Sequence, residues 1–153
     1  MMMKFFRDLR GEEGGAAIVE LALAAPFLAV MVIGMSDLSR GYSAKVQLEQ
    51  AAQRSVEKVM QGAKNTTVYN TLKTEAATAA GVSESAVVVD YWLECNGTRS
   101  ATYETNCTSG QVYARYLSVE ITKNYKPMFK IKWAGSKADG SFDLIGKAGI
   151  RVQ

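Results

Sequence analysis

The sequence predicts an α+β fold, in which one long N-terminal helix precedes a shorter helix and a sheet of three or four antiparallel strands. Three observations carry this prediction. Residues 16–35 are almost wholly apolar, and residues 39–60 repeat apolar side chains at helical spacing. Three later segments, about 86–95, 112–125 and 141–152, are rich in alternating β-forming residues.

The apolar segment reads AAIVELALAAPFLAVMVIGM, and Glu20 is its single charge. As a helix rising 1.5 Å per residue, a segment of this length spans roughly 30 Å, the thickness of a bilayer hydrocarbon core. We therefore expect a transmembrane helix over residues 16–38.

Three interpretations of this region are open: a cleaved secretory signal peptide, an ordinary uncleaved anchor, and an anchor whose short leader is cut on the cytoplasmic side. An A-x-A pattern at residues 22–24 is typical of a signal-peptide cleavage site. Cleavage there would leave the apolar run 26–35 exposed on the mature protein. A glutamate inside the apolar region also fits a signal peptide badly.

Glu20 distinguishes these interpretations. An acidic residue at the middle of a transmembrane helix costs about 2.5–3.5 kcal/mol on insertion, although Glu20 lies near the interface, where the cost is lower. Cleavage between Gly15 and Ala16 would create an α-amino group at Ala16 that is positively charged at neutral pH. That amine would lie one helical turn from Glu20, so it could pair with this carboxylate or with that of a neighbouring subunit.

Gly15 to Glu20 has the Gly-x4-Glu form of a type IV prepilin cleavage site. The wider segment 14–55 resembles the N-terminal segment of TadE-like proteins, the minor pilins (pseudopilins) of Flp/Tad-type IV pili. In the leader, the matching features are the Arg7-Asp8 pair and the Gly-rich end. After the cut they are Glu20 and Pro26 in the apolar segment, followed by Asp37 and Arg40 after it. A Gln/Ala-rich helix comes last. Two positions depart from the family pattern, since Leu21 replaces the usual aromatic residue and Asp37 stands where Glu is common.

The resemblance implies a leader at residues 1–15, a transmembrane helix at 16–38 and an extracytoplasmic pilin-like domain at 39–153. It implies cleavage by a prepilin peptidase and partnership with other major and minor pilins in the bacterial inner membrane and in the assembled pilus. The N-terminus would be cytoplasmic and the C-terminal domain periplasmic. Basic residues are nearly balanced on the two sides of the span, so charge alone does not set this orientation.

The helix is expected to continue beyond the membrane over residues 39–61. One apolar stripe recurs at steps of four, four and three, formed by Leu48, Ala52, Val56 and Val59. We expect this stripe to pack on the protein's own sheet rather than on a partner.

A second helix is predicted over residues 66–80, with Gly81 suited to the position after its end. Four side chains are expected to share its buried face: Val68, Leu72, Ala76 and Ala79.

Alternation predicts the inward faces of three strands. The residues are Val87, Val89, Tyr91 and Leu93 in the first strand, Leu117, Val119 and Ile121 in the second, and Phe142, Leu144, Gly146, Ala148, Ile150 and Val152 in the last. Residues 96–110 read as a polar loop, Met128 to Trp133 as a short apolar stretch without an assigned form, and residues 138–140 as a turn.

Cys95 and Cys107 are the two cysteines of the chain, and both lie in its polar part. A lone pair at this spacing is a weak metal signal, but it indicates a disulfide if the domain faces an oxidising compartment. The alternative is two free thiols.

The composition argues against several functions. The chain lacks histidine, so the Ser-His-Asp and Cys-His constellations and the usual zinc sites are excluded. A net charge of +3 without a basic, aromatic-rich cluster does not indicate nucleic-acid binding. We expect no enzyme activity, no catalytic residue, no metal and no cofactor. Besides the minor pilin, an unprocessed membrane-anchored periplasmic scaffold or binding domain remains open.

Overall fold

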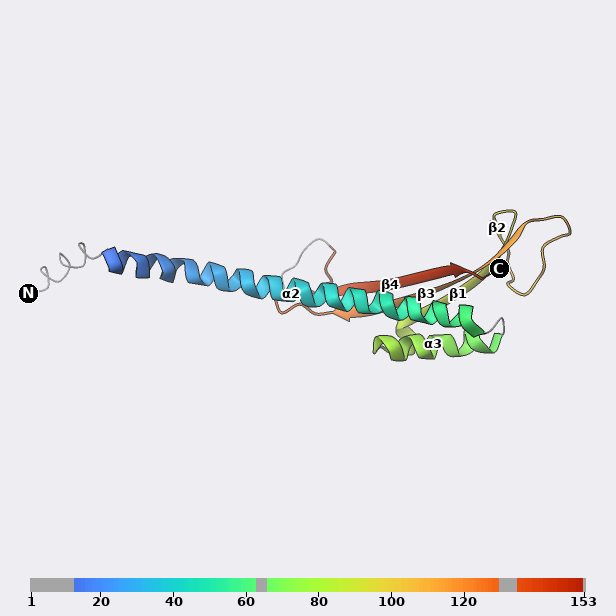
Figure 1. Cartoon of the computed structure of the whole chain (residues 1–153), viewed down its shortest axis with the longest axis horizontal. Coiled ribbons are helices and arrows are strands. Elements are labelled where there is room, and N and C mark those ends of the chain that lie inside the picture. Colours follow the sequence, from blue (N-terminus) through green and yellow to red (C-terminus); the bar gives the residue numbers. More distant parts are fainter. Residues whose placement is uncertain (1–12, 63–65, 130–134, 153) are drawn as a thin grey trace, which may run out of the picture. The chain divides into compact units, whose positions relative to one another are not determined.

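The computed structural model describes residues 13–62, 66–129 and 135–152 (Figure 1). The chain forms two compact units, Met1–Ser39 and Arg40–Gln153. The predicted α+β class is confirmed, with helix α2 at Glu13–Gly62, helix α3 at Thr66–Ala80 and a four-stranded antiparallel sheet.

Helix α2 carries the predicted apolar stripe into the core of the second unit. Leu48, Ala52, Val56 and Val59 are all buried, and they belong to one cluster with the sheet residues Leu117, Val119 and Ile121. The stripe therefore packs on the protein's own sheet, as expected. Ser55 is buried beside it and stays satisfied because its hydroxyl donates to the carbonyl oxygen of Ala51 at 2.8 Å.

Helix α3 has the predicted bounds and the predicted glycine after its end. Gly81 has φ +62°, its N–H donates to the Thr78 carbonyl at 3.2 Å, and the Val82 N–H donates to the Ala77 carbonyl at 3.0 Å. This pair of bonds is the Schellman arrangement, which satisfies the last carbonyls of a helix.

The buried face of α3 differs in part from the prediction. Leu72 and Ala76 are buried, but Ala79 is exposed and Ala77 is buried in its place. With 3.6 residues per turn, Ala79 lies about 40° from the midpoint of Leu72 and Ala76 and Ala77 about 120° from it, so the burial of Ala77 reflects tertiary packing in the core cluster rather than helical periodicity. Val68 lies outside the residues whose side chains are described.

The sheet has the strand order β2-β1-β3-β4, and every pair is antiparallel (Figure 1). A short 3₁₀ turn, η1 at Glu84–Ala86, leads into the first strand. The strands are β1 at Val87–Cys95, β2 at Thr98–Arg99, β3 at Tyr113–Tyr125 and β4 at Phe142–Arg151.

The register places the predicted inward residues opposite one another. In β1 and β3, Val87 faces Ile121 and Val89 faces Val119, while Val119 also faces Ala148 of β4. Successive side chains alternate between the two faces of a sheet, so these apolar residues lie on one face. That face packs against α2 and α3 in one core cluster.

The predicted loop 96–110 is wrong in one detail, because it contains β2. Asn96 and Gly97 have φ values of +50° and +79°, and Cys95 pairs with Thr98 across them. Two consecutive positive φ values make the tight hairpin turn that Asn-Gly favours. The Asn-Gly dipeptide was therefore the signal for this hairpin.

The apolar stretch Met128 to Trp133 lies partly outside the described residues, which stop at Phe129 and resume at Gly135. The predicted turn before the last strand is present, since the Gly140 N–H donates to the Lys137 carbonyl at 2.9 Å and Gly140 has φ +79°.

Candidate functional site

The bond between Gly15 and Ala16 lies in the first turn of α2, which begins at Glu13. Glu20 lies further along the same helix, and its side chain is exposed. Because four helical residues rise about 6 Å, a new amine at Ala16 would lie within one turn of the Glu20 carboxylate. The Ala16 amine and the Glu20 carboxylate of one chain are therefore close enough to pair without a second subunit.

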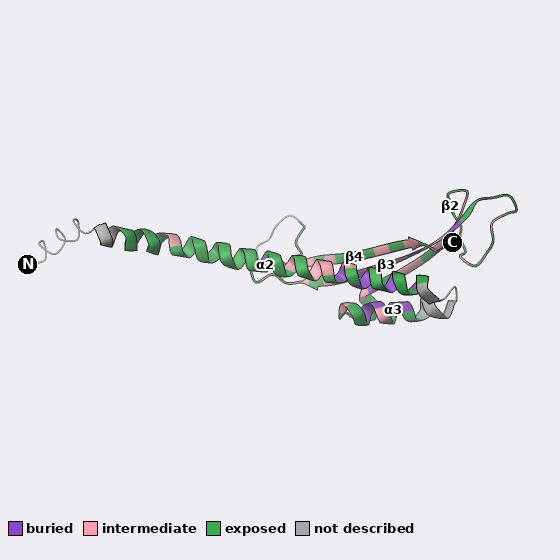
Figure 2. Ribbon diagram, viewed as in Figure 1, coloured by how far each residue is buried: buried purple, intermediate pink, exposed green. Residues whose placement is uncertain are grey.

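Most residues of α2 in the first unit are exposed (Figure 2), and most of them are apolar. The described helix contains one stretch that is long and apolar enough to cross a membrane, and none of that stretch is buried inside the protein. Exposed apolar surface of this extent is typical of a membrane or protein contact. The large exposed side chains are Ile18, Val19, Leu21, Leu23, Phe27, Leu28, Val30, Met31, Val32, Ile33, Met35 and Leu38.

Asp37 stands apart from these neighbours, because its side chain is buried. Asp37 is the acidic residue that follows the apolar segment in the TadE-like pattern described above. The other polar residues around it, Ser36 and Ser39, are exposed, and the Ser36 hydroxyl donates to the Val32 carbonyl at 2.9 Å.

Cys95 and Cys107 form a disulfide, with 5.6 Å between their Cα atoms. It joins the end of β1 to the loop that leads into β3. Asn96 supports the same loop, since its backbone N–H donates to the Val112 carbonyl at 2.7 Å and its side-chain oxygen accepts from the Val112 N–H at 2.9 Å.

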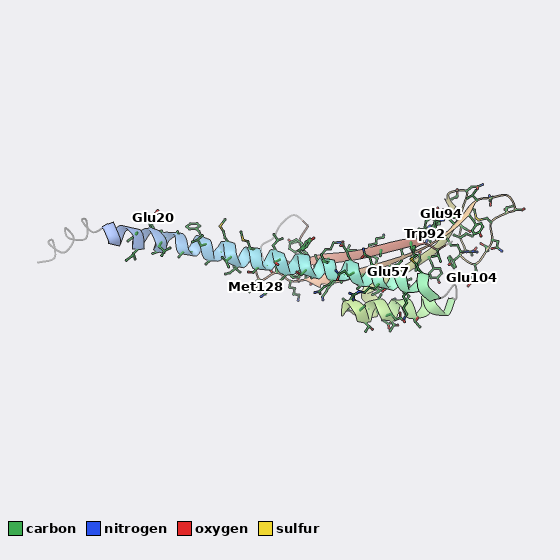
Figure 3. The ribbon with its side chains drawn as sticks, in the orientation of Figure 1. Glu20, Glu57, Trp92, Glu94, Glu104 and Met128 are labelled. Carbon is green, nitrogen blue, oxygen red and sulfur yellow. A yellow bond between two sulfur atoms is a disulfide. The ribbon has the colours of Figure 1, made fainter. Side chains whose placement is uncertain are left out.

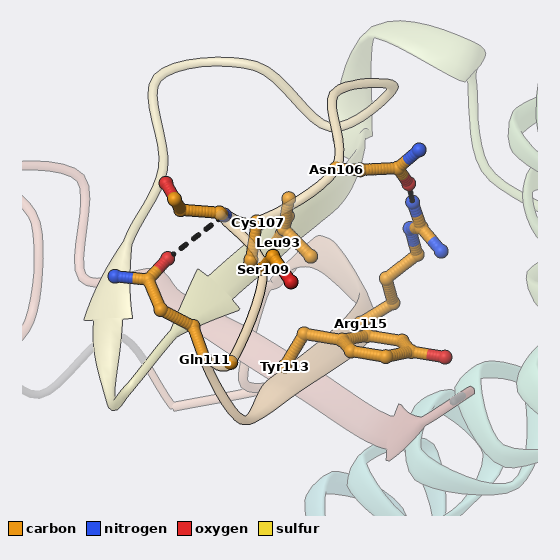
Figure 4. A pocket seen from close by; sticks show the side chains of 9 residues that line it. Leu93, Asn106, Cys107, Ser109, Gln111, Tyr113 and Arg115 are labelled. Carbon is orange, nitrogen blue, oxygen red and sulfur yellow. Dashed lines mark hydrogen bonds between the residues drawn. The ribbon is translucent and has the colours of Figure 1, made fainter.

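A pocket of about 380 Å³ lies beneath this loop (Figure 4). On its rim, the Thr108 N–H donates to the Gln111 side-chain oxygen at 3.0 Å, and Arg115 donates to the Asn106 side-chain oxygen at 3.3 Å. The Arg115 guanidinium also lies over two tyrosine rings, 5.7 Å from the centre of Tyr103 and 5.8 Å from that of Tyr113. The polar groups at this rim bond to one another, and they form no pair of nucleophile and base.

The sheet face opposite the core carries an aromatic and charged group. The Trp92 and Tyr116 rings stack with 5.2 Å between their centres, and the Arg99 guanidinium lies 4.9 Å from the centre of the Trp92 ring. Arg99 also forms an ion pair with Asp90 at 2.8 Å, and the Trp92 indole N–H donates to the Glu94 carboxylate at 2.9 Å. These contacts order side chains on the outer surface of β1, β2 and β3.

Two carboxylates have lowered pKa values at this end of the sheet, Asp139 in the turn before β4 and Asp143 near the start of β4. The hydroxyl of Ser141, donating at 2.7 Å, lowers the pKa of Asp139. The ammonium of Lys137, donating at 2.6 Å, lowers the pKa of Asp143, and the Asn124 amide adds to this effect. The Asn124–Asp143 bond also joins β3 to β4 at this end of the sheet.

Metal binding has little support in the residues that the structure describes, where no group of three or more Cys, Asp or Glu side chains comes together. Asp139 and Asp143 engage Ser141 and Lys137 instead. The predicted site residues belong to different units: the cleavage bond and Glu20 to the first, and the disulfide to the second.

The sequence identified Cys107 at this pocket but not Arg115. Its contacts with Tyr103 and Asn106 span a loop of irregular backbone, which has no periodicity to reveal them.

A comparison with protein families found one match, to the family described as TadE-like protein, over residues 15–56. The match covers the predicted cleavage bond, Glu20, the apolar stretch and most of the helix stripe. The resemblance seen in the sequence is therefore confirmed over this segment. Neither the curated proteins nor the solved structures include a match to the chain.

Proposed function

Because residues 15–56 of this chain belong to the TadE-like family, we propose that the protein is a minor pilin (pseudopilin) of a Tad-type pilus, made as a precursor and processed by a prepilin peptidase. The observation that carries this proposal is the family match, which begins at Gly15 itself. Residues 1–15 are then the leader, and Ala16 is the first residue of the mature chain.

The exposed apolar stretch of α2 supports a single-pass anchor over residues 16–38. The N-terminus lies in the cytoplasm and residues 39–153 form the pilin-like domain in the periplasm. The Cys95–Cys107 disulfide supports this orientation, because disulfides persist in oxidising compartments.

The role in assembly follows from chemistry within the membrane. Small side chains permit close approach of helices in lipid, and Ala22, Ala24, Ala25 and Ala29 supply them. The amine of processed Ala16 pairs with Glu20, in the same subunit or in its neighbour. A neighbour out of axial register would leave a charge unpaired in lipid, so the pair favours one register.

The work of this protein is structural rather than enzymatic. Its partners are the prepilin peptidase, the other major and minor pilins and the inner membrane, and the assembled structure serves secretion and adhesion. This assignment rests on the match of residues 15–56 to the TadE-like family.

The N-terminal sequence of the mature protein tests processing. Co-expression with a prepilin peptidase should yield a chain that starts at Ala16, and Gly15→Leu should block the cut. Gly34→Leu is the matched control: an added Cβ at either glycine meets nothing within 4 Å, so both variants place the same side chain in open space. Gly34→Leu should be processed normally.

An intact N-terminus in the presence of an active peptidase would contradict the processing proposal. That result would favour an unprocessed, membrane-anchored periplasmic scaffold or binding domain. A start at any residue other than Ala16 would equally contradict it.

A further inference from the structure

The segment that starts the β3–β4 connection, at Tyr125 and Met128, contacts α2 at Arg40 and Gly41. The Arg40 guanidinium donates to the Met128 sulfur at 3.3 Å. A Cβ built on Gly41 would lie 3.4 Å from Tyr125 Cε1, so the Tyr125 ring lies flush against the helix there. Both contacts lie within the second unit.

These contacts place the start of the connection beside Arg40 and Gly41, the first residues of the second unit. The apolar stretch reaches Met35, and Arg40 follows only five residues later in the same helix. Five helical residues rise about 7.5 Å, which is comparable to the depth of a headgroup layer. In a chain anchored through residues 16–38, Arg40 thus follows the end of the apolar stretch within about one headgroup depth, and Met128 contacts Arg40.

The side chains at this level are of the kind that bind a membrane surface. Met128, labelled in Figure 3, is 61% exposed and Phe129 is 40% exposed, although both are apolar. Tyr42, two residues beyond Arg40 and so about 200° around the helix, is 71% exposed. Tyrosine and tryptophan concentrate at membrane interfaces because their rings are amphipathic, with an apolar body and a polar group.

Two cations accompany these apolar groups. Lys126 is exposed at the start of the connection, and Arg40 bonds to a thioether, which is a weak acceptor. A guanidinium has five N–H donors in a fork that matches phosphate oxygens, and the described contact engages one nitrogen. Lys137 does not join them, because it is paired with Asp143.

We propose that Arg40, Tyr42, Lys126, Met128 and Phe129 form a membrane-surface collar, which binds anionic phospholipid headgroups where α2 leaves the bilayer. Arg40 and Lys126 contact lipid phosphates, and Met128 and Phe129 enter the interface. The collar fixes the second unit on the membrane before assembly. This inference rests on the proposed anchoring of residues 16–38.

Site-directed fluorescence on the full chain tests the collar. Both native cysteines are in the disulfide, so one added cysteine can be labelled alone. We would label Phe129→Cys with an environment-sensitive dye and insert the protein into vesicles of phosphatidylcholine with or without phosphatidylglycerol. A nitroxide on the lipid headgroup should quench this label, more strongly in the vesicles that contain phosphatidylglycerol.

Two control labels separate this inference from the proposed function. Ala29→Cys reports insertion of the apolar segment, through quenching by a nitroxide deep in the acyl chains. Glu104→Cys, on the exposed disulfide loop away from Met128 in the same unit, should remain unquenched (Figure 3). Quenching at Ala29 without quenching at Phe129 overturns the collar and leaves the anchor intact, whereas no quenching at Ala29 overturns both.

The charge dependence supplies a second test. Arg40→Gln or Lys126→Gln, in the labelled background, should reduce the ratio of docked to undocked collar about fivefold each, but only with phosphatidylglycerol present. Quenching that ignores both the lipid charge and these substitutions overturns the proposed headgroup contact. A label that is shielded from water without lipid quenching indicates a protein partner instead, and it also overturns the collar.

Discussion

Gly146 of β4 passes directly beneath Leu48 of α2, and the two backbones are in contact. A Cβ built on Gly146 would lie 2.4 Å from the carbonyl carbon of Leu48 and 2.6 Å from its Cβ. Leu48 is 1% exposed, so it has no space into which to retreat. The helix rests on the sheet at this point because residue 146 has no side chain.

Gly146→Ala should therefore destabilise the second unit. The new methyl group meets helix backbone, and overpacking of this kind costs about 1–3 kcal/mol or more. Thermal unfolding of the full chain, followed by circular dichroism, should show a lower midpoint.

Gly149→Ala is the matched control on the same strand. Its added Cβ would lie 3.4 Å from the nearest atom, the Leu117 carbonyl oxygen, and the position is exposed. The Gly149 variant should unfold near the wild-type temperature. Equal effects of the two substitutions would show that strand propensity, rather than the contact with Leu48, explains the loss.

Removal of the disulfide should lower the stability of the second unit by about 3 kcal/mol, the chain-entropy value for a loop of this length. We would compare the double variant Cys95→Ala/Cys107→Ala with the oxidised and the reduced wild type. The reduced wild type should match the double variant. If all three proteins unfold at the same temperature, the bond does not constrain the unfolded chain as expected.

The stability of the β3–β4 turn should fall in acid. The pKa values of Asp139 and Asp143 are lowered in the folded protein, from an ordinary value of 3.8. The folded state therefore favours the charged carboxylates. Their contribution to stability is complete above pH 3.8 and is lost as the pH falls below it, toward the folded pKa values.

Unfolding measured across pH 2–6 checks this dependence. Ser141→Ala removes the main cause of the shift at Asp139, and Lys137→Gln removes the main cause at Asp143. Each variant should lose less stability on acidification than the wild type does. Identical pH profiles for all three proteins would contradict the role of these bonds.

Glu20→Ala should leave processing at Gly15 largely intact but weaken assembly. The proposed partner, the amine of Ala16, would remain unpaired in lipid, and loss of one partner of a desolvated pair costs about 3–5 kcal/mol. Glu13→Ala is the control, because the leader takes residue 13 away before assembly. Recovery of the protein with sheared pili, measured by immunoblot, should fall for the Glu20 variant alone; recovery equal to that of the control would refute the pairing.

The sequence by itself determined the elements that depend on local periodicity. The apolar run 16–35 predicted the exposed segment of α2, and the spacing of Leu48 to Val59 predicted the helix stripe that the core buries. The alternation of apolar residues in 112–125 and 141–152 likewise predicted β3 and β4, and each predicted end differs from the observed end by no more than one residue. Gly15 and Glu20 could be singled out because their significance lies in their spacing along the chain.

Only the tertiary structure decided what depends on contacts between distant segments. It set the strand order β2-β1-β3-β4, chose Ala77 over Ala79 for the buried face of α3, and brought Gly146 beneath Leu48. It also joined Arg40 to Met128, which are 88 residues apart. Periodicity shows which side of an element is apolar, but the approach of two backbones depends on the packing of the whole core, which no local pattern contains.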